Sequence, residues 1–286
     1  MDILIGGAVF GLGFGIVNVM QNYMIQVGAE PHLRQRLFSG LHANYAAAAI
    51  LVPIVANLMN DLGWHLVFLA MGTLPLIVVF FSFFIGDSSD HYRKLTERNP
   101  LPKNIFWQAV VVSIAFAFYL NAELSLSTRL VHFLETELGY AKSYANYHFL
   151  GFFVGMFLGR VAIAKYNISI RPLIMILISS LLSCLSVLSM LYLEPWSVVA
   201  SGVFFGPVFP FYLEYLSRKF DHYADRVLSL ALSISALGVV IMHTVVGYLS
   251  DTMSIGQALL VGPVGLLIFA LLMGFHDRQY KPVSSV

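Results

Sequence analysis

Residues 105–131 read IFWQAVVVSIAFAFYLNAELSLSTRLV, an apolar run in which Glu123 and Arg129 are the charged side chains. It is longer than the roughly 20 residues that a helix needs to cross the hydrocarbon core of a bilayer. In lipid, backbone polar groups have no water to bond, so only helices and closed barrels are stable there. The run lacks the strict alternation of a barrel strand, so it predicts a transmembrane helix.

Eight similar apolar runs flank this one. They lie at about residues 3–27, 36–59, 62–85, 143–166, 171–193, 196–217, 226–249 and 255–275. The composition agrees, because 58% of the 286 residues are hydrophobic and 11% are charged, whereas a soluble domain carries about 25% charged residues. The sequence therefore predicts an all-α polytopic membrane protein with about nine transmembrane helices.

The basic residues are sorted between alternate connections. If the first run starts outside the cell, one face of the membrane receives all but two of the 16 Lys and Arg residues. These residues are Arg34, Arg36, Arg93, Lys94, Arg98, Lys103, Arg160, Lys165, Arg171, Arg218, Lys219, Arg226, Arg278 and Lys281. Only Arg129 and Lys142 remain for the opposite face. The positive-inside rule then predicts an external amino terminus and a cytoplasmic carboxyl terminus.

Residues 86–104 form the longest polar stretch, and Pro100 and Pro102 disfavour a continuous helix there. This stretch separates three runs from six.

Glycines at four-residue spacing occur in the first and fifth runs, as Gly7, Gly11 and Gly15 and as Gly151, Gly155 and Gly159. Small residues let membrane helices approach closely, so both sets predict contacts within one bundle, with a homodimer face as the alternative. Pro207 and Pro210 lie within one run and predict a bend, which either lines a cavity or is a structural kink.

Glu123 is the foremost candidate for function, because a carboxylate inside a membrane needs a cation, water or a task. In a dry site the neutral form is favoured, so Glu123 is a candidate proton carrier. The alternative is a structural hydrogen bond or ion pair within the bundle. His243 is a second candidate for proton coupling, since histidine titrates near neutral pH, although a buried structural histidine is the alternative.

Other polar residues inside the runs are candidates for binding a solute. Asn18 and Asn22 share one helical face, and their amides both donate and accept hydrogen bonds; interhelical hydrogen bonding is the alternative reading. The full set of substrate-binding candidates is Asn18, Asn22, Asn44, Tyr45, Asn121, Glu123, Tyr147 and Tyr212. Arg160 and Glu214 lie near the predicted cytoplasmic ends of their runs, where an arginine either snorkels to water or forms a gate ion pair. Arg160 is the candidate cytoplasmic gate.

Signatures of soluble enzymes are absent from the sequence, including the phosphate loop, HExxH, paired cysteines and GxSxG. We therefore expect no catalytic residues, cofactor or metal site. No basic cluster indicates nucleic-acid binding. The expected partners are the lipid bilayer, a small solute and protons.

Several segments, in order, resemble the fucose-permease-like branch of the major facilitator superfamily. Residues 11–22 (GLGFGIVNVMQN) resemble its fourth helix, residues 36–45 (RLFSGLHANY) its fifth and residues 63–65 (GWH) the start of its sixth. Residues 121–125 (NAELS), 155–160 (GMFLGR) and 206–210 (GPVFP) are similar to its seventh, eighth and tenth helices. The resemblance covers essentially the whole chain and matches it to helices four to twelve of a twelve-helix fold.

This resemblance implies a partial N-terminal bundle of three helices at 1–85, a central cytoplasmic loop at 86–104 and a C-terminal six-helix bundle at 105–286 with a short cytoplasmic tail. It also implies a midplane substrate site and alternating access, commonly driven by protons. That branch carries a glutamate in its fourth helix where this chain has Asn18, so coupling would pass to Glu123 or His243. The chain is expected to be N-terminally incomplete, which would expose Asn18 and Asn22 to lipid or to another chain.

The leading hypothesis is thus a secondary active transporter of a sugar or other small polar metabolite in the cell (inner) membrane, coupled to protons. The alternative is a truncated, non-transporting membrane protein that acts as a regulatory or assembly partner. A membrane enzyme is disfavoured, because no reactive cluster gathers near one interface.

Overall fold

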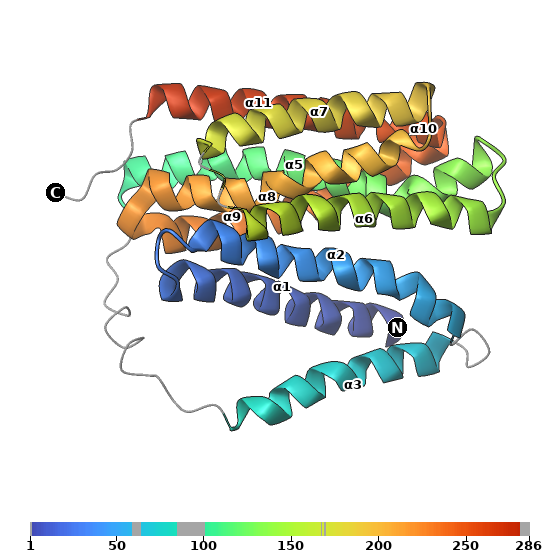
Figure 1. Cartoon of the computed structure of the whole chain (residues 1–286), viewed down its shortest axis with the longest axis horizontal. Coiled ribbons are helices and arrows are strands. Elements are labelled where there is room, and N and C mark those ends of the chain that lie inside the picture. Colours follow the sequence, from blue (N-terminus) through green and yellow to red (C-terminus); the bar gives the residue numbers. More distant parts are fainter. Residues whose placement is uncertain (1, 59–63, 85–100, 167, 169, 281–286) are drawn as a thin grey trace.

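The computed structural model describes residues 2–58, 64–84, 101–166, 168 and 170–280, and the regular elements in this part of the chain are helices (Figure 1). The long helices are α1 (Asp2–Gly28), α2 (Arg34–Leu58), α3 (Trp64–Ser82), α5 (Lys103–Thr136), α6 (Lys142–Lys165), α7 (Pro172–Tyr192), α8 (Ser197–Phe220), α9 (Ala224–Thr252) and α11 (Val261–Gln279). The all-α prediction is confirmed.

Seven continuous helical stretches of the described residues are long and apolar enough to cross a membrane. One of them, Ser197–Thr252, contains both α8 and α9, which are separated by the short 3-10 helix η2 (Asp221–Tyr223). Helix α3, with 19 residues, is a further long helix. Within the described residues, each of the nine predicted runs therefore contains one long helix.

The last predicted run, 255–275, differs from a single helix. It begins with the short helix α10 (Ile255–Leu259), whose amino terminus is capped by a capping box between Ser254 and Gln257. Helix α11 follows after Leu260. Pro263 lies in the first turn of α11, where the missing N–H of a proline costs no helical hydrogen bond. A proline in the middle of a continuous helix would remove one, so the break at Leu260 accommodates it.

The helices run back and forth between two ends of the bundle (Figure 1). At one end α1, α6, α8 and α11 finish and α2, α5, α7 and α9 begin. We call this the basic end, because Arg34, Lys103, Lys165, Arg171 and Lys219 lie there. The turn from α5 to α6 and helix α10 lie at the opposite end (Figure 1).

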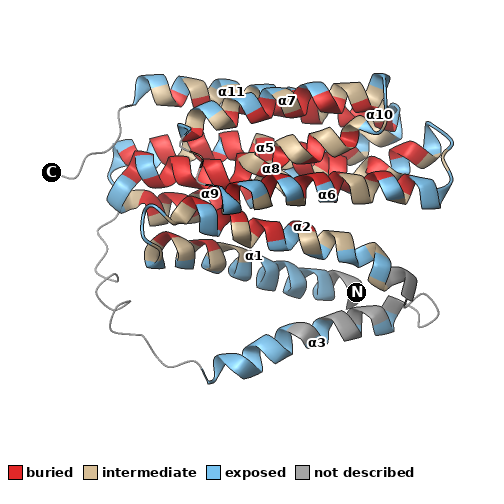
Figure 2. Cartoon of the chain, in the orientation of Figure 1, coloured by how far each residue is buried: buried red, intermediate tan, exposed pale blue. Residues whose placement is uncertain are grey.

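The buried residues concentrate in the helices from α5 onward (Figure 2). Helix α8 contacts α2, α6, α7 and α9, and α5 contacts α6, α9 and α11. Between α5 and α8, Phe116 stacks on Tyr212 with a centroid distance of 4.0 Å, and Phe209 meets Phe116 edge-on at 4.9 Å. Helix α2 packs on α6 and α8, and α1 packs on α9 and α2.

The glycines of α6 lie against the backbone of α8, as predicted. A Cβ on Gly155 would lie 2.3 Å from the carbonyl oxygen of Val199, and a Cβ on Gly159 would lie 2.6 Å from that of Val203. Only hydrogen atoms fit at these positions, so the spacing lets two membrane helices touch backbone to backbone.

The described residues show no such contact for α1. Among the described residues, nothing lies within 4 Å of a Cβ placed on Gly7, Gly11 or Gly15. Residues 5–14 of α1 are exposed, with Phe10 at 73% and Phe14 at 58% (Figure 2). Helix α1 instead uses its second half, around the buried Asn22 and Gln26, to meet its neighbours.

The predicted loop at 86–104 falls outside the described residues as far as residue 100, and α5 already begins at Lys103. Arg93, Lys94 and Arg98 are among the residues that lie outside the description.

Candidate functional site

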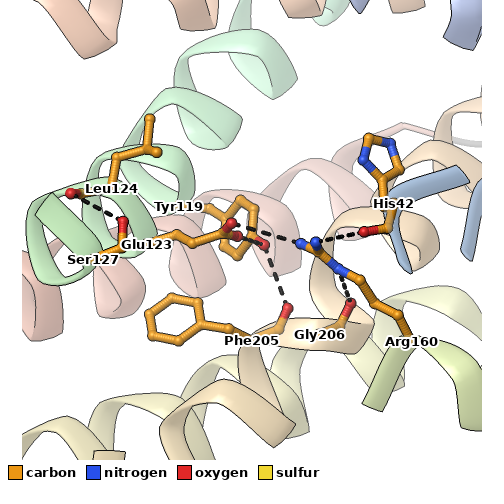
Figure 3. A network of polar contacts seen from close by, with 8 residues as sticks. All are labelled: His42, Tyr119, Glu123, Leu124, Ser127, Arg160, Phe205 and Gly206. Atoms are coloured by element: carbon orange, nitrogen blue, oxygen red, sulfur yellow. Dashed lines mark hydrogen bonds and ion pairs between the residues drawn. The ribbon is translucent and has the colours of Figure 1, made fainter. Parts of the chain in front are cut away.

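Glu123 and Arg160 form a buried ion pair between α5 and α6 (Figure 3). The Nη2 atom of Arg160 lies 3.6 Å from Oε1 of Glu123, and their side chains are 1% and 6% exposed. A buried carboxylate is stable only when a cation and hydrogen bonds compensate it. The cation that Glu123 requires is thus supplied within the chain.

The guanidinium of Arg160 also bonds two backbone carbonyls from other helices. Its Nε donates to the oxygen of Gly206 in α8 at 3.4 Å, and its Nη1 donates to the oxygen of His42 in α2 at 2.9 Å (Figure 3). The Gly206 oxygen is available because its usual helical donor would be the N–H of residue 210, which is a proline. One arginine therefore joins α2, α5, α6 and α8.

Tyr119 completes the surroundings of Glu123 from one turn earlier in α5. Its hydroxyl donates to Oε2 of Glu123 and also lies 3.3 Å from the carbonyl oxygen of Phe205 (Figure 3). A hydroxyl has one hydrogen, so it can fully serve only one of these acceptors at a time. The two acceptors give the tyrosine two alternative bonding states.

The polar contacts continue into α1 through His42. Its Nε2 lies 3.1 Å from Oδ1 of Asn22, and Nδ2 of Asn22 donates to the carbonyl oxygen of Asn18 at 2.8 Å. The His42 ring packs on Phe209 with a centroid distance of 3.9 Å. Asn22 is 0% exposed. The expectation that Asn22 faces lipid is therefore wrong, because α2 and α9 cover this part of α1.

A cavity of about 520 Å³ lies between α2, α5 and α6, toward the opposite end from the basic one. It is lined by Tyr45, Ala48, Ala49, Val52, Leu124, Ser127, Thr128, Val131, Phe149 and Phe153. Its Leu124 and Ser127 lie beside Glu123 in α5 (Figure 3). The Tyr45 ring connects the cavity to the ion pair, since the Cζ atom of Arg160 lies 5.9 Å from its centroid.

Five of the predicted site residues thus lie in or beside one network, namely Asn18, Asn22, Tyr45, Glu123 and Arg160. The snorkelling alternative for Arg160 is wrong, because its side chain turns inward to the carboxylate and the two carbonyls instead of toward water.

The remaining predicted residues lie elsewhere. Asn44, Tyr147 and His243 are exposed. Tyr212 is buried, and its hydroxyl donates to the carbonyl oxygen of Val112 at 3.1 Å. Asn121 points to the other side of α5 and lines a separate cavity of about 390 Å³ between α5, α9, α10 and α11.

The sequence reasoning missed Tyr119, Ser127 and Thr128. Tyr119 was recognisable, because a residue four positions before Glu123 shares its helical face. Ser127 lies on that face too, one turn after Glu123. Nothing in the sequence indicated that the carbonyl groups of Phe205 and His42 would take part. Within the described residues, no group of three His, Cys, Asp or Glu side chains is arranged to hold a metal ion.

The geometry defines a class of protein, a multi-pass helical membrane protein with a buried charge pair where its helices meet. Residues 3–242 match the model of the Major Facilitator Superfamily, and the chain belongs to this superfamily of transporters. The predicted resemblance to this superfamily is confirmed.

Two solved structures share the fold. The E. coli fucose:proton symporter FucP, in a variant form, has a TM-score of 0.67 at 13% identity, over 93% of this chain and 74% of FucP. FucP in the outward conformation has a TM-score of 0.63 at 13% identity, over 90% of this chain and 71% of FucP. A comparison with curated proteins found no match.

Proposed function

We propose that this protein is a secondary active transporter that moves a small polar solute, a sugar or other metabolite, by alternating access coupled to protons. The observation that carries the proposal is the buried pair of Glu123 and Arg160, whose arginine also bonds α2. Glu123 can gain or lose a proton, and Arg160 links it to α2. Helix α2 precedes residues 86–104, whereas α5 and α6 follow them. FucP, which shares the fold, is a fucose:proton symporter.

Protonation of Glu123 would change three contacts at once. With Glu123 ionised, Arg160 pairs with it and Tyr119 donates to it. When Glu123 takes a proton, the attraction to Arg160 is lost, and the new O–H donates to the Tyr119 oxygen. The Tyr119 hydrogen then turns to the carbonyl oxygen of Phe205. Arg160 is left as a buried cation without its carboxylate, which favours rearrangement of α2, α5 and α6.

The cavity beside the pair suits an uncharged solute. Ser127 and Thr128 both donate to the carbonyl oxygen of Leu124, at 3.3 and 2.6 Å, so their own oxygens remain as acceptors. Phe149 and Phe153 offer apolar surface. The charge of Arg160 is already balanced by Glu123. A molecule with hydroxyl or N–H donors and an apolar face would fit these groups.

Transport by the complete chain in proteoliposomes tests the proposal. We expect that an inward proton gradient drives uptake of a sugar or related solute. Glu123→Gln should abolish the response to the gradient and retain exchange of solute at equal concentrations. Glu135→Gln, on the same helix, is the matched control and should behave as the parent protein. An unchanged gradient response in Glu123→Gln would remove Glu123 from the mechanism.

We further propose that the basic end faces the cytoplasm, with the amino terminus outside the cell (inner) membrane. The sorting of basic residues supports this orientation. The proposed division is a partial N-terminal bundle at 1–85, a cytoplasmic loop at 86–104 and a C-terminal bundle at 105–286. A membrane-impermeant thiol reagent should label a cysteine placed at Leu138 from outside, and label one placed at Arg171 only after permeabilisation.

A non-transporting role as a regulatory or assembly partner is the second candidate. It is favoured by the glycines of α1, which no described residue covers, and by the exposed apolar side chains of α3, such as Phe80 and Phe81. Such a surface suits another membrane helix. Stable co-purification with a second membrane protein, together with absence of uptake, would support this candidate over transport.

A further inference from the structure

The hydrogen bonds that join α1 and α2 to the later helices all lie toward the basic end in the described part of the chain. Arg36 donates from Nε to the carbonyl oxygen of Ala164, in the last turn of α6, at 2.8 Å. Ser217, in the last turn of α8, donates to Oε1 of Gln26 in α1. The bond from Arg160 to His42 is the third and lies deepest in the bundle.

The same helices separate toward the opposite end. There the cavity between α2, α5 and α6 is lined by Ala48 and Val52 on one side and by Thr128 and Val131 on the other. Residues 5–14 of α1 are exposed. The contact between the early and late helices is therefore closed at the basic end and open at the other.

The hydrogen bond between Gln26 and Ser217 is shielded from solvent, because the two residues are only 5% and 7% exposed. Opening of the basic end would break it. Ser217 also donates to the carbonyl oxygen of Leu213 at 3.0 Å, so its hydroxyl has a second acceptor in its own helix. The serine can release Gln26 without losing every hydrogen-bond acceptor.

Three buried polar atoms in α2 and α8 lack hydrogen-bond partners among the described residues. They are Nε2 of Gln35, Oγ of Ser39 and Oε2 of Glu214. Gln35, Ser39 and His42 share one face of α2, and α2 packs on α6 and α8. A buried polar group without a partner opposes the state that buries it. Water would reach these groups if the basic end opened.

We propose that Gln26 and Ser217 form the latch of a gate at the basic end, and that Gln35, Ser39 and Glu214 bias the gate toward opening. The latch holds the gate closed, and the unpartnered groups oppose closure, so the two states stay close in free energy. This inference rests on the proposed transport cycle, for which it supplies the inner gate. Along α8, Ser217 lies about three turns closer to the basic end than Gly206, the residue that Arg160 bonds.

Spin-label distances test the gate without any solute. Labels at Val52→Cys and Val131→Cys, in a Cys184→Ser background, span the open cavity of the complete chain in lipid nanodiscs. Ser217→Ala should move the population toward the shorter distance by roughly 2- to 10-fold, because one hydrogen bond of the closed gate is lost. Ser39→Ala should move it the other way by a similar factor. Ser201→Ala, a buried serine that bonds only within α8, should change nothing.

Cross-linking provides a second measurement, in which a covalent link takes the place of the hydrogen bond between Gln26 and Ser217. A short bifunctional thiol reagent joining Gln26→Cys to Ser217→Cys should fix the longer distance between the labels. Shifts of Ser217→Ala and Ser39→Ala in the same direction, or a cross-linked protein that still samples the shorter distance, would overturn the gate. Gate responses as expected, in a protein that takes up no solute, would overturn the transport proposal and leave the latch intact.

Discussion

Arg160 of α6 donates from Nε to the carbonyl oxygen of Gly206 in α8 at 3.4 Å, an oxygen that Pro210 leaves without its helical donor. The two helices are close enough for this bond because glycines face each other, with a Cβ on Gly206 lying 3.3 Å from the Cα of Gly159. A proline and a glycine contact together create the acceptor that a buried guanidinium needs.

Removing the arginine alone should cost far more than removing the pair. Arg160→Met leaves Glu123 as an uncompensated buried charge, and we expect a loss of about 3–5 kcal/mol in unfolding free energy. Glu123→Gln combined with Arg160→Met should recover part of that loss, because no buried charge remains. Denaturant unfolding of the four proteins in detergent measures the coupling, and simple additivity would contradict a buried ion pair.

The two glycine sets should respond differently to one added methyl group. Gly155→Ala places Cβ 2.3 Å from the carbonyl oxygen of Val199, and we expect a loss of about 1–3 kcal/mol from overpacking. Gly11→Ala meets nothing within 4 Å in the described residues, and alanine favours a helix over glycine by about 1 kcal/mol. Gly11→Ala should thus keep or raise the thermal stability. Equal losses at both sites would show that α1 packs its glycines against a partner.

Asp277 should stabilise the basic end of the late helices. It accepts from Lys219 Nζ at 2.8 Å, and the lysine side chain is 5% exposed. Asp277→Asn would leave that buried ammonium without its carboxylate, and we expect a loss of about 1–3 kcal/mol because Asp277 itself is partly exposed. Asp251→Asn, an exposed aspartate at the end of α9, is the control. Thermal unfolding in lipid measures both, and equal effects would contradict the pairing.

Thiol labelling should separate Asn22 from Asn44. In a Cys184→Ser background, Asn44→Cys should react readily with a lipid-soluble maleimide, because Asn44 is exposed. Asn22→Cys should react at least 10-fold more slowly, because Asn22 is buried in α1 where it contacts His42 of α2. Similar rates would contradict the packing of α1 on its neighbours.

The helices themselves were predictable from residue order. Runs such as 105–131 must be helical in lipid, because a helix bonds its own backbone without help from other segments. The break at Leu260 was not predicted, since its cause combines a local capping box at Ser254 with Pro263.

The site was only partly predictable. Glu123 and Arg160 were each recognised as costly in a membrane, but in sequence they lie on different helices, and the arginine was placed at a gate or in water. Their pairing depends on α5 and α6 running antiparallel and on α8 approaching α6 at the glycines. Asn121 and Glu123 were predicted to line one site, but they are two positions apart and therefore lie on opposite sides of one helix.

The sequence by itself determined the all-α membrane fold, the run boundaries and the sorting of basic residues, because lipid imposes these on each segment separately. The tertiary structure decided that Arg160 compensates Glu123, that Asn22 is buried and that no described residue covers the glycines of α1. Those outcomes depend on which helix faces which, and the packing of helices in three dimensions is not encoded in any single run.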